Sequence, residues 1–272
     1  MLSSQQKGLN RNTIDKFYTD TSYAKRCVEN CMKYVEISTQ DLIIEPSAGN
    51  GSFISSIEES HSDCKFYDIE PENYKITKQD YLLLDAASLT KRNVHIIGNP
   101  PFGRQSSLAI KFIKKSCEFA RSISFILPRS FKKDSMQSKF DDKFHLLFEE
   151  DVPMNSFIVN GDTYDVPCVF QIWVKKDLNR IKLNKKTSAG FEFVKIDESP
   201  DISFRRVGVY AGKIDTDTNK SEQSHYFIKF TNNQILSENL DKLKTVVFEF
   251  NNTVGPKSIS KQELISEFNR VL

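Results

Sequence analysis

The chain begins with a polar stretch, and its first regular hydrophobic pattern appears after residue 20. Residues 1–16 show no apolar periodicity, so we predict a flexible N-terminal arm there. Six apolar residues then recur at the spacing of one helix face: Ala24, Cys27, Val28, Cys31, Met32 and Val35. Asp20, Thr21 and Ser22 precede them and are suitable N-cap residues. The pattern predicts an amphipathic helix whose two cysteines fill the core.

From residue 41 onward, short apolar runs alternate with helical segments. Four runs are typical of buried strands: 41–46, 64–70, 94–99 and 122–128. Two segments with helical patterns lie at 51–60 and 107–120. Strands that alternate with helices form βαβ crossovers. We therefore predict an α/β fold with a doubly wound, mainly parallel sheet.

Three further strand-like runs follow in close succession, at 144–150, 155–161 and 166–174. The loop GDTYD separates the last two, which is typical of a β-hairpin. We therefore predict that the sheet ends in an antiparallel hairpin formed by these two runs.

The remainder of the chain predicts a second, smaller region. A polar linker, 175–190, is followed by strand-like runs at 202–210, 225–230 and 245–250. Ser260 and Glu263 form a capping box for a last helix. We predict a main domain over 17–175 and a linker with a small accessory or target-recognition region over 176–272.

Composition excludes several classes of protein. The 272 residues are 39% hydrophobic and 27% charged, which suits one sizeable core with or without a small lobe. No apolar run reaches the roughly 18–20 residues of a membrane span, and the start lacks the apolar core of a signal peptide.

The five cysteines include no C-x-x-C pair, so we expect reduced thiols in a cytoplasmic protein and no metal site. Of four scattered histidines, His95 lies within a strand and is expected to be packed.

The first chemical signal is the turn between the strand at 41–46 and the helix after it. It reads Glu45-Pro46-Ser47-Ala48-Gly49-Asn50-Gly51. Two glycines let the backbone turn tightly and approach a ligand, and ligands of open α/β sheets bind at such strand-to-helix turns. The pattern is neither G-x-G-x-x-G nor a P-loop, so it favours a nucleotide without a pyrophosphate. Taken alone, the turn is equally compatible with a structural role.

The second signal is a set of acids at successive strand ends. Asp68 and Glu70 end the next strand, where a carboxylate can accept hydrogen bonds from ribose hydroxyls. Ile69 offers an apolar surface, and Asp80 and Tyr81 supply a polar acceptor and an aromatic face at the following loop. Each acid alone is typical of a solvated surface, whereas the spacing of one per strand end favours an adenosine site.

The third signal is the tetrapeptide NPPF, Asn99 to Phe102, directly after the strand at 94–99. Its structural interpretation is a rigid turn, because proline lacks an N–H donor and fixes φ. Its chemical interpretation uses all four residues. The Asn99 side-chain oxygen and the Pro100 carbonyl can accept both hydrogens of a ring-bound amine, which frees its lone pair for attack on an electrophile. The prolines hold that carbonyl in place, and Phe102 offers a face for a base.

These motifs together resemble the S-adenosylmethionine-dependent amino-methyltransferases of nucleic acid, especially the adenine-N6 type. Phe17-Tyr18-Thr19 resembles the N-terminal motif with which that family touches the methionine end of the cofactor. The motif order is similar to the gamma arrangement of DNA adenine methyltransferases. The resemblance covers about residues 15–175, and 165–173 looks like the closing hairpin of such viral, phage and bacterial enzymes. It implies a Rossmann-like methyltransferase sheet.

The resemblance also implies roles for individual residues. Glu45 would hold the amine of the cofactor, and Asp68 or Glu70 its ribose. Asp80 would hold the adenine amine and Tyr81 the ring. The implied cofactor-binding set is Tyr18, Thr19, Glu45, Pro46, Ser47, Ala48, Gly49, Asn50, Gly51, Asp68, Ile69, Asp80, Tyr81 and Asn99. The implied catalytic set is Asn99, Pro100, Pro101 and Phe102.

The leading hypothesis is therefore an adenine-N6 methyltransferase that acts on DNA at a flipped or unpaired base. RNA adenine is the first alternative, and N4-cytosine and the glutamine N5 of proteins are more distant ones. A catalytically silent, methyltransferase-like subunit that binds nucleic acid is an alternative of another class. The region after 190 is short for a full target-recognition domain, which leaves room for a partner subunit that recognises the target.

Local charge adds to this hypothesis, since the net charge is only +2. Nine Lys and Arg lie between 104 and 139 against two acids, and six lie between 175 and 186 against one. We expect both stretches to flank the catalytic mouth and to bind phosphates. The residues proposed for this contact are Arg104, Lys132, Lys133, Lys175 and Lys176. The structural alternative is a solvated helix face and a polar linker.

Overall fold

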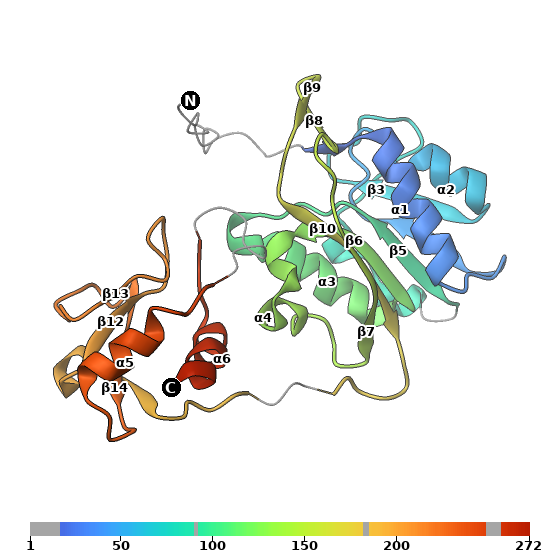
Figure 1. The fold of residues 1–272 in the computed structure, drawn as a ribbon. Coiled ribbons are helices and arrows are strands. Elements are labelled where there is room, and N and C mark those ends of the chain that lie inside the picture. The colour runs from blue at the N-terminus through green and yellow to red at the C-terminus, as the bar shows by residue number, and fades with distance from the viewer. Residues whose placement is uncertain (1–16, 90–91, 182–184, 249–256) are drawn as a thin grey trace. The chain divides into compact units, whose positions relative to one another are not determined.

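The structure is a computed structural model that describes residues 17–89, 92–181, 185–248 and 257–272 (Figure 1). The predicted arm, 1–16, lies outside the described residues. The chain forms two compact units, Met1–Arg180 and Ile181–Leu272. The first unit extends past residue 175 because Arg180 lies 5.0 Å from the Trp173 ring and donates to the backbone oxygens of Gln137 and Phe140.

A seven-stranded sheet forms the centre of the first unit. Its order is β4-β3-β2-β5-β6-β10-β7. The strands are β2 (Leu42–Glu45), β3 (Cys64–Asp68), β4 (Thr77–Lys78), β5 (Val94–Gly98), β6 (Ser122–Pro128), β7 (Phe144–Asp151) and β10 (Cys168–Lys175). The strands from β4 to β6 run parallel, whereas β10 is antiparallel to both of its neighbours. The predicted α/β fold with a mainly parallel sheet and an antiparallel end is confirmed.

The strand order places a switch point beside β2. The chain starts at β2, moves outward through β3 to β4, and then returns to β5 on the other side of β2. Connections that leave in opposite directions open a crevice at the carboxyl ends of the two strands where the order reverses. The Gly-rich turn follows β2 and the NPPF motif follows β5, so the topology brings these two motifs to one crevice.

Helices cover both faces of this sheet (Figure 1). On one face lie α1 (Thr21–Tyr34) and α2 (Ile54–Ser60), and on the other α3 (Ser107–Phe119). The predicted cap of α1 is confirmed, because the Asp20 carboxylate accepts from the backbone of Ser22 and Tyr23. Cys27 and Cys31 are buried on the inner face of α1, as the helix pattern predicts.

The hairpin in this part of the chain differs from the predicted one and belongs to a separate three-stranded sheet. It has the order β1-β8-β9, from Tyr18–Thr19, Phe157–Val159 and Asp162–Tyr164. The tight turn lies at Asn160 and Gly161, which both have positive φ, so β8 pairs with β9 and not with β10. Instead, β10 enters the main sheet between β6 and β7. The hairpin predicted between 155–161 and 166–174 is therefore wrong.

Short helices fill the connections of the first unit. They are η1 (Tyr81–Leu83), η2 (Ala86–Ser88), η3 (Arg104–Ser106), η4 (Arg129–Lys132) and α4 (Asp134–Gln137). Two of them, η3 and η4, follow the carboxyl ends of β5 and β6 and therefore lie at the same edge of the sheet as the crevice.

The second unit has its own sheet and core. The sheet has the order β11-β14-β12-β13, from Phe191–Val194, His225–Phe230, Ile202–Arg205 and Ile214–Asp215. The helices are η5 (Ile196–Glu198), α5 (Leu236–Leu243) and α6 (Lys261–Val271). The capping box of Ser260 and Glu263 is confirmed. The strand predicted over 245–250 is wrong for 245–248, which follow α5 without forming a strand, and 249–250 lie outside the described residues.

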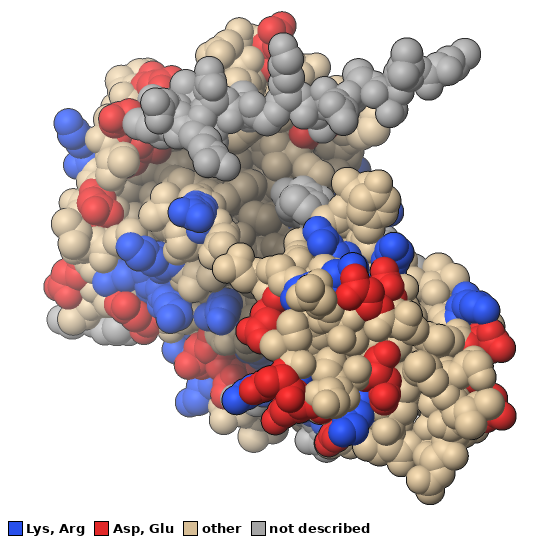
Figure 2. Space-filling view, turned by 90° about the vertical axis from the view of Figure 1, so that its left-hand side faces the viewer, with Lys and Arg blue, Asp and Glu red and all other residues tan. Residues whose placement is uncertain are grey.

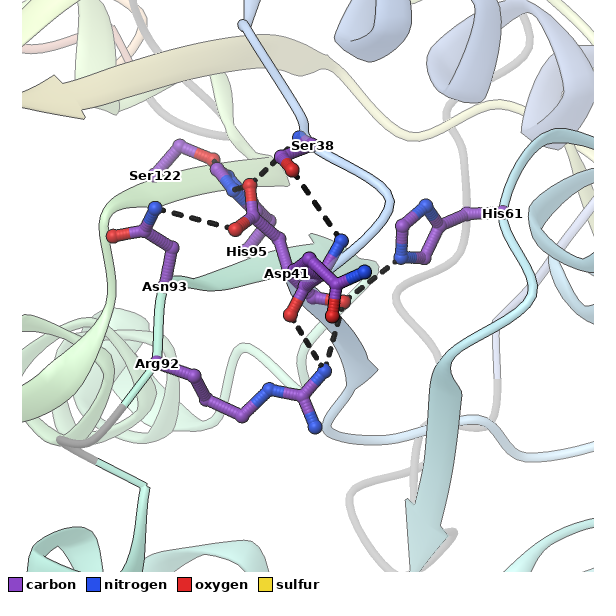
Figure 3. Close-up of polar contacts among 8 residues, drawn as sticks. Ser38, Asp41, His61, Arg92, Asn93, His95 and Ser122 are labelled. Carbon is purple, nitrogen blue, oxygen red and sulfur yellow. Dashed lines mark hydrogen bonds and ion pairs between the residues drawn. The ribbon is translucent and has the colours of Figure 1, made fainter.

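A buried polar cluster ties together the amino ends of β2, β5 and β6 (Figure 3). His95 is 1% exposed, and its Nε2 lies 3.2 Å from Asp41 Oδ2 while its Nδ1 lies 2.8 Å from Ser122 Oγ. A carboxylate can only accept, so Nε2 carries the proton and Nδ1 accepts from Ser122. Burial lowers the pKa of His95 despite the nearby carboxylate. The histidine is packed, as predicted from its position in a strand.

Candidate active site at the carboxyl edge of the sheet

The Gly-rich turn after β2 is held in one conformation by its neighbours. Gly49 has a φ of +51°, and a Cβ there would lie 3.0 Å from Cε1 of the Tyr18 ring, so this position requires glycine. The Gly49 N–H donates to Asp68 Oδ2 at 2.8 Å, and its carbonyl accepts from the Glu72 N–H at 3.0 Å. Tyr18 also donates its hydroxyl to Glu72 Oε1 at 2.5 Å. The turn is thus fastened both to β1 and to the end of β3.

Glu45 presents an unusual carboxylate at the start of this turn. Its side chain is 2% exposed, and Oε2 has no hydrogen-bond partner among the described residues. Burial, with a smaller contribution from the nearby Asp68, raises the pKa of Glu45 to about 8. Buried polar atoms of native proteins are nearly always hydrogen-bonded. The position therefore suits a ligand group that donates hydrogen bonds and carries positive charge.

Gly98 brings the end of β5 against this carboxylate. A Cβ on Gly98 would lie 3.1 Å from Glu45 Cγ, so the two strand ends are in direct contact. The Ser47 hydroxyl also donates to the Asn99 carbonyl at 3.2 Å. The Gly-rich turn and the NPPF motif are therefore adjacent, within one hydrogen bond of each other.

The orientation of the Asn99 side chain is fixed by β1. Nδ2 donates to the Phe17 carbonyl and to Thr19 Oγ1, both at 3.2 Å. A carbonyl oxygen can only accept, so Nδ2 faces Phe17 and Oδ1 must face away from it. β1 therefore binds the nitrogen of the amide and not Oδ1, the atom that the sequence analysis predicts to be an acceptor.

The rest of the motif is anchored in the core. Pro100 is buried, Pro101 is exposed, and Phe102 is half-buried against the apolar residues on both sides of the sheet. The Phe102 carbonyl accepts from the backbone of Leu108 and Ala109 at the start of α3. These contacts leave little freedom in the backbone between β5 and α3.

The two acids after β3 differ in their contacts and in their exposure. Asp68 accepts from the backbone N–H groups of Gly49 and Glu70, both at 2.8 Å, so it shapes the turn. Glu70 is exposed. Ile69 between them is 62% exposed, an apolar side chain beside the polar turn. Asp68 contacts the turn through a hydrogen bond of its side chain, and the roles predicted for Asp68 and Glu70 stay predictions.

The two residues predicted after β4 differ in their accessibility. Asp80 is half-buried and caps η1 by accepting from the Leu82 N–H at 2.9 Å. Tyr81 is only 1% exposed, and its ring stacks on Phe112 at 5.4 Å while its hydroxyl bonds Ser116 at 2.7 Å. The prediction that the Tyr81 ring faces the ligand is therefore wrong. A tyrosine ring packs in the core where its hydroxyl finds a hydrogen-bond partner, as that of Tyr81 does.

The basic residues do not all lie at the crevice. Arg104 lies two residues after Phe102 of NPPF and is exposed, Lys133 follows η4, and Lys132 pairs with Asp151 at 2.9 Å. Lys175 ends β10, and Lys176 follows it. Because β10 is antiparallel to β6, the Lys175 N–H donates to the carbonyl of Arg121 just before β6, so both lysines lie at the opposite edge of the sheet. The prediction that these two lysines flank the catalytic mouth is wrong. Figure 2 shows acidic side chains interspersed among the basic ones on the face that it displays.

Three contributors to the site were not anticipated from the sequence. Glu72 bonds both Tyr18 and Gly49, Gly98 makes room for Glu45, and the Phe17 carbonyl binds Asn99. The acid-rich stretch after β3 was a usable signal for Glu72. The other two depend on contacts between residues more than fifty positions apart, for which the sequence carries no local signal.

The described residues were compared with the requirements of a metal site and of a membrane-spanning helix. No cluster of three or more His, Cys, Asp or Glu among the described residues could hold a metal ion. Within the same residues, every helix is too short or too polar to cross a membrane.

Comparisons with known proteins point to one family. The EDM2 methyltransferase-like domain family matches residues 36–181. Protein ENHANCED DOWNY MILDEW 2 of Arabidopsis thaliana is 24% identical over 270 residues, which cover 88% of this chain and 20% of that protein. The chain thus spans about a fifth of the length of this curated relative.

Solved structures with a similar fold include two methyltransferases of ribosomal RNA. The 23S rRNA methyltransferase ErmE has a TM-score of 0.47 and 13% identity, over 60% of this chain and 71% of that one. An rRNA methylase from Streptococcus thermophilus has a TM-score of 0.37 and 12% identity, over 56% of this chain and 94% of that one.

Proposed function

The chain belongs to the family of EDM2 methyltransferase-like domains, and we propose that it is an S-adenosylmethionine-dependent methyltransferase that acts on the N6 amine of adenine in DNA. One observation carries the proposal. The Asn99 amide is held by β1 with its oxygen turned away, and the same residue is hydrogen-bonded to the Gly-rich turn through Ser47. An acceptor for an amine and a turn suited to a nucleotide cofactor therefore share one crevice.

The residues around the turn fit S-adenosylmethionine. The Glu45 carboxylate, whose Oε2 has no hydrogen-bond partner among the described residues, suits the α-ammonium group of the cofactor, and Asp68 or Glu70 suits its ribose hydroxyls. Ile69 offers an exposed apolar surface for the adenine ring, and Asp80 an acceptor for its amine. When bound, the cofactor would supply an electrophilic methyl group on a sulfonium.

The NPPF motif would prepare the target amine. The lone pair of a ring-bound amine is delocalised and therefore a poor nucleophile. Asn99 Oδ1 and the Pro100 carbonyl would accept its two hydrogens and favour a pyramidal nitrogen. Because both acceptors are fixed by their surroundings, little reorganisation is needed at the moment of transfer. Half-buried Phe102 would stack on the base, which must be flipped or unpaired to reach the crevice.

The test is a transfer assay that does not presuppose the substrate. The full chain is incubated with methyl-labelled cofactor and with separate pools of DNA and RNA, and the nucleosides are then identified by mass spectrometry. We expect N6-methyladenine in the DNA pool. Label in the RNA pool or on cytosine would assign the substrate to that class instead. Retained nucleic-acid binding without any heat of cofactor binding in calorimetry would identify a silent binding subunit instead.

A further inference from the structure

Both hydrogen bonds that orient Asn99 come from one short strand. The acceptors are the Phe17 carbonyl, directly before β1, and Thr19 Oγ1 within it, and both lie 3.2 Å from Nδ2. Thr19 is 4% exposed. Terminal amide torsions of asparagine have broad minima, so an amide group without partners samples several orientations. The pair of acceptors therefore selects one of them.

The strand that provides these acceptors is itself held in place by β8, which comes much later in the sequence of the first unit. Tyr18 and Thr19 pair with Ile158 and Phe157 of β8, and the Asp20 N–H donates to the Ser156 carbonyl at 2.9 Å. Neighbouring side chains of a strand point to opposite faces. Accordingly, the Tyr18 ring lies against Gly49 while the Thr19 hydroxyl reaches Asn99. The strand thus contacts both motifs of the crevice.

We propose that Thr19 is a positioning residue that acts through Asn99, turning Oδ1 toward the target amine, and not a contact of the cofactor. This inference rests on the proposed function of Asn99. It replaces the role that the family resemblance implies for Thr19. Its hydroxyl accepts from Nδ2 and so supplies one of the two bonds that prevent the amide from rotating. The Phe17 carbonyl supplies the other and belongs to the backbone, so Thr19 is the member of the pair that a substitution can remove.

The two roles predict different kinetic signatures. A positioning residue affects the rate of transfer once cofactor is bound, whereas a cofactor contact affects the dissociation constant of the cofactor. Loss of one hydrogen bond worth about 1 kcal/mol lowers the rate by about fivefold to tenfold.

The experiment compares Thr19→Val, which removes the acceptor at nearly equal volume, with Thr19→Ser, which keeps it. Thr163→Val is the matched control, because Thr163 is exposed in the adjoining β9 hairpin. Each variant is measured for single-turnover methyl transfer at saturating cofactor and for cofactor affinity by calorimetry. We expect a fivefold to tenfold slower transfer for Thr19→Val, an unchanged cofactor affinity, and near-normal transfer for Thr19→Ser and for the control.

A second readout needs no substrate. The side-chain NH2 signals of Asn99 are identified in a 15N-labelled protein by their loss in Asn99→Asp. We expect one of the two proton shifts to move upfield in Thr19→Val and to return in Thr19→Ser. Unchanged signals in Thr19→Val, or weaker cofactor binding with a normal rate at saturation, would overturn the positioning role. The expected signals in a protein that transfers no methyl group would uphold the contact and contradict the proposed function alone.

Discussion

The protonation of Glu45 is the property of the candidate site that a cationic ligand would change. Its Oε2 is buried without a partner among the described residues, and burial, together with Asp68, keeps its pKa near 8. At pH 7 this carboxyl group is therefore mainly protonated. An ammonium group next to it would favour the ionised form, so binding of a cationic ligand is coupled to release of a proton.

This coupling predicts a pH dependence of cofactor affinity. Between pH 6 and about 8, affinity should rise with pH, because less free energy is needed to ionise Glu45, and it should then level off. Calorimetry in two buffers of different ionisation enthalpy measures the released proton. Glu45→Gln should weaken binding and abolish the pH dependence. Equal affinity of wild type and Glu45→Gln at all pH values would contradict a role for this carboxylate.

The same shift has a defined sign for stability. The ordinary carboxyl pKa of 4.5 applies to the unfolded chain, and the folded value is raised. Between these values the folded protein holds a proton that the unfolded chain has lost, so this group makes the unfolding free energy fall as pH rises from about 4.5 to about 8. Denaturant titrations of wild type and Glu45→Gln check this, since the variant lacks that contribution to the slope.

Gly98 has a space requirement that can be tested directly. A methyl group there would lie 3.1 Å from Glu45 Cγ, and the buried Glu45 side chain has little room to retreat. We expect Gly98→Ala to lower the unfolding free energy by about 1–3 kcal/mol and to weaken cofactor binding. Gly161→Ala is the control, because Gly161 also has a positive φ but no atom within 4 Å of its built Cβ. Normal cofactor binding by Gly98→Ala would show that Glu45 does not need its present position.

At the level of elements, the amino ends of β2, β5 and β6 depend on His95 remaining neutral. Burial lowers its pKa below the ordinary value of 6.5, so in acid the unfolded chain takes up a proton first. The unfolding free energy should therefore fall as pH drops below about 6.5. Below the pKa of His95 in the folded protein, this histidine should cause no further decrease. Denaturant titrations from pH 7.5 to 5 would check this. His95→Gln should remove this contribution and cost about 1–3 kcal/mol at pH 7.5, since it leaves buried partners incompletely bonded.

The elements also show what sequence patterns can and cannot predict. The strands at β2, β3, β5 and β6 were predictable because each is a short apolar run bounded by turn residues. The partner of β10 was not, because pairing depends on which edge is free once the parallel strands have assembled. Tyr81 was assigned to the ligand on local spacing, and the neighbouring Phe112 and Ser116 draw it into the core. The adjacency of the NPPF motif and the Gly-rich turn is a consequence of the strand order, because both motifs follow strand ends at the switch point.

For the molecule as a whole, strand direction determines which basic side chains lie at the crevice, where they could contact a nucleic-acid substrate. Exposed Arg104 lies two residues after Phe102 of NPPF, whereas Lys175 and Lys176 lie at the opposite edge because β10 is antiparallel. We expect Arg104→Ala to weaken nucleic-acid binding and to reduce its salt dependence by about one phosphate contact. The double variant Lys175→Ala and Lys176→Ala removes more charge and should have the smaller effect. Fluorescence anisotropy with a labelled oligonucleotide at several salt concentrations measures both, and the reverse order would contradict this assignment.

In the proposed reaction, Asn99 Oδ1 and the Pro100 carbonyl activate a ring-bound amine next to the cofactor turn. Single-turnover transfer from labelled S-adenosylmethionine to adenine-containing DNA, compared between wild type and Asn99→Ala, tests it most directly. We predict N6-methyladenine from the wild type, a rate at least about a hundredfold lower for Asn99→Ala, and nearly equal cofactor affinity by calorimetry. Transfer by Asn99→Ala at the wild-type rate would contradict the claim.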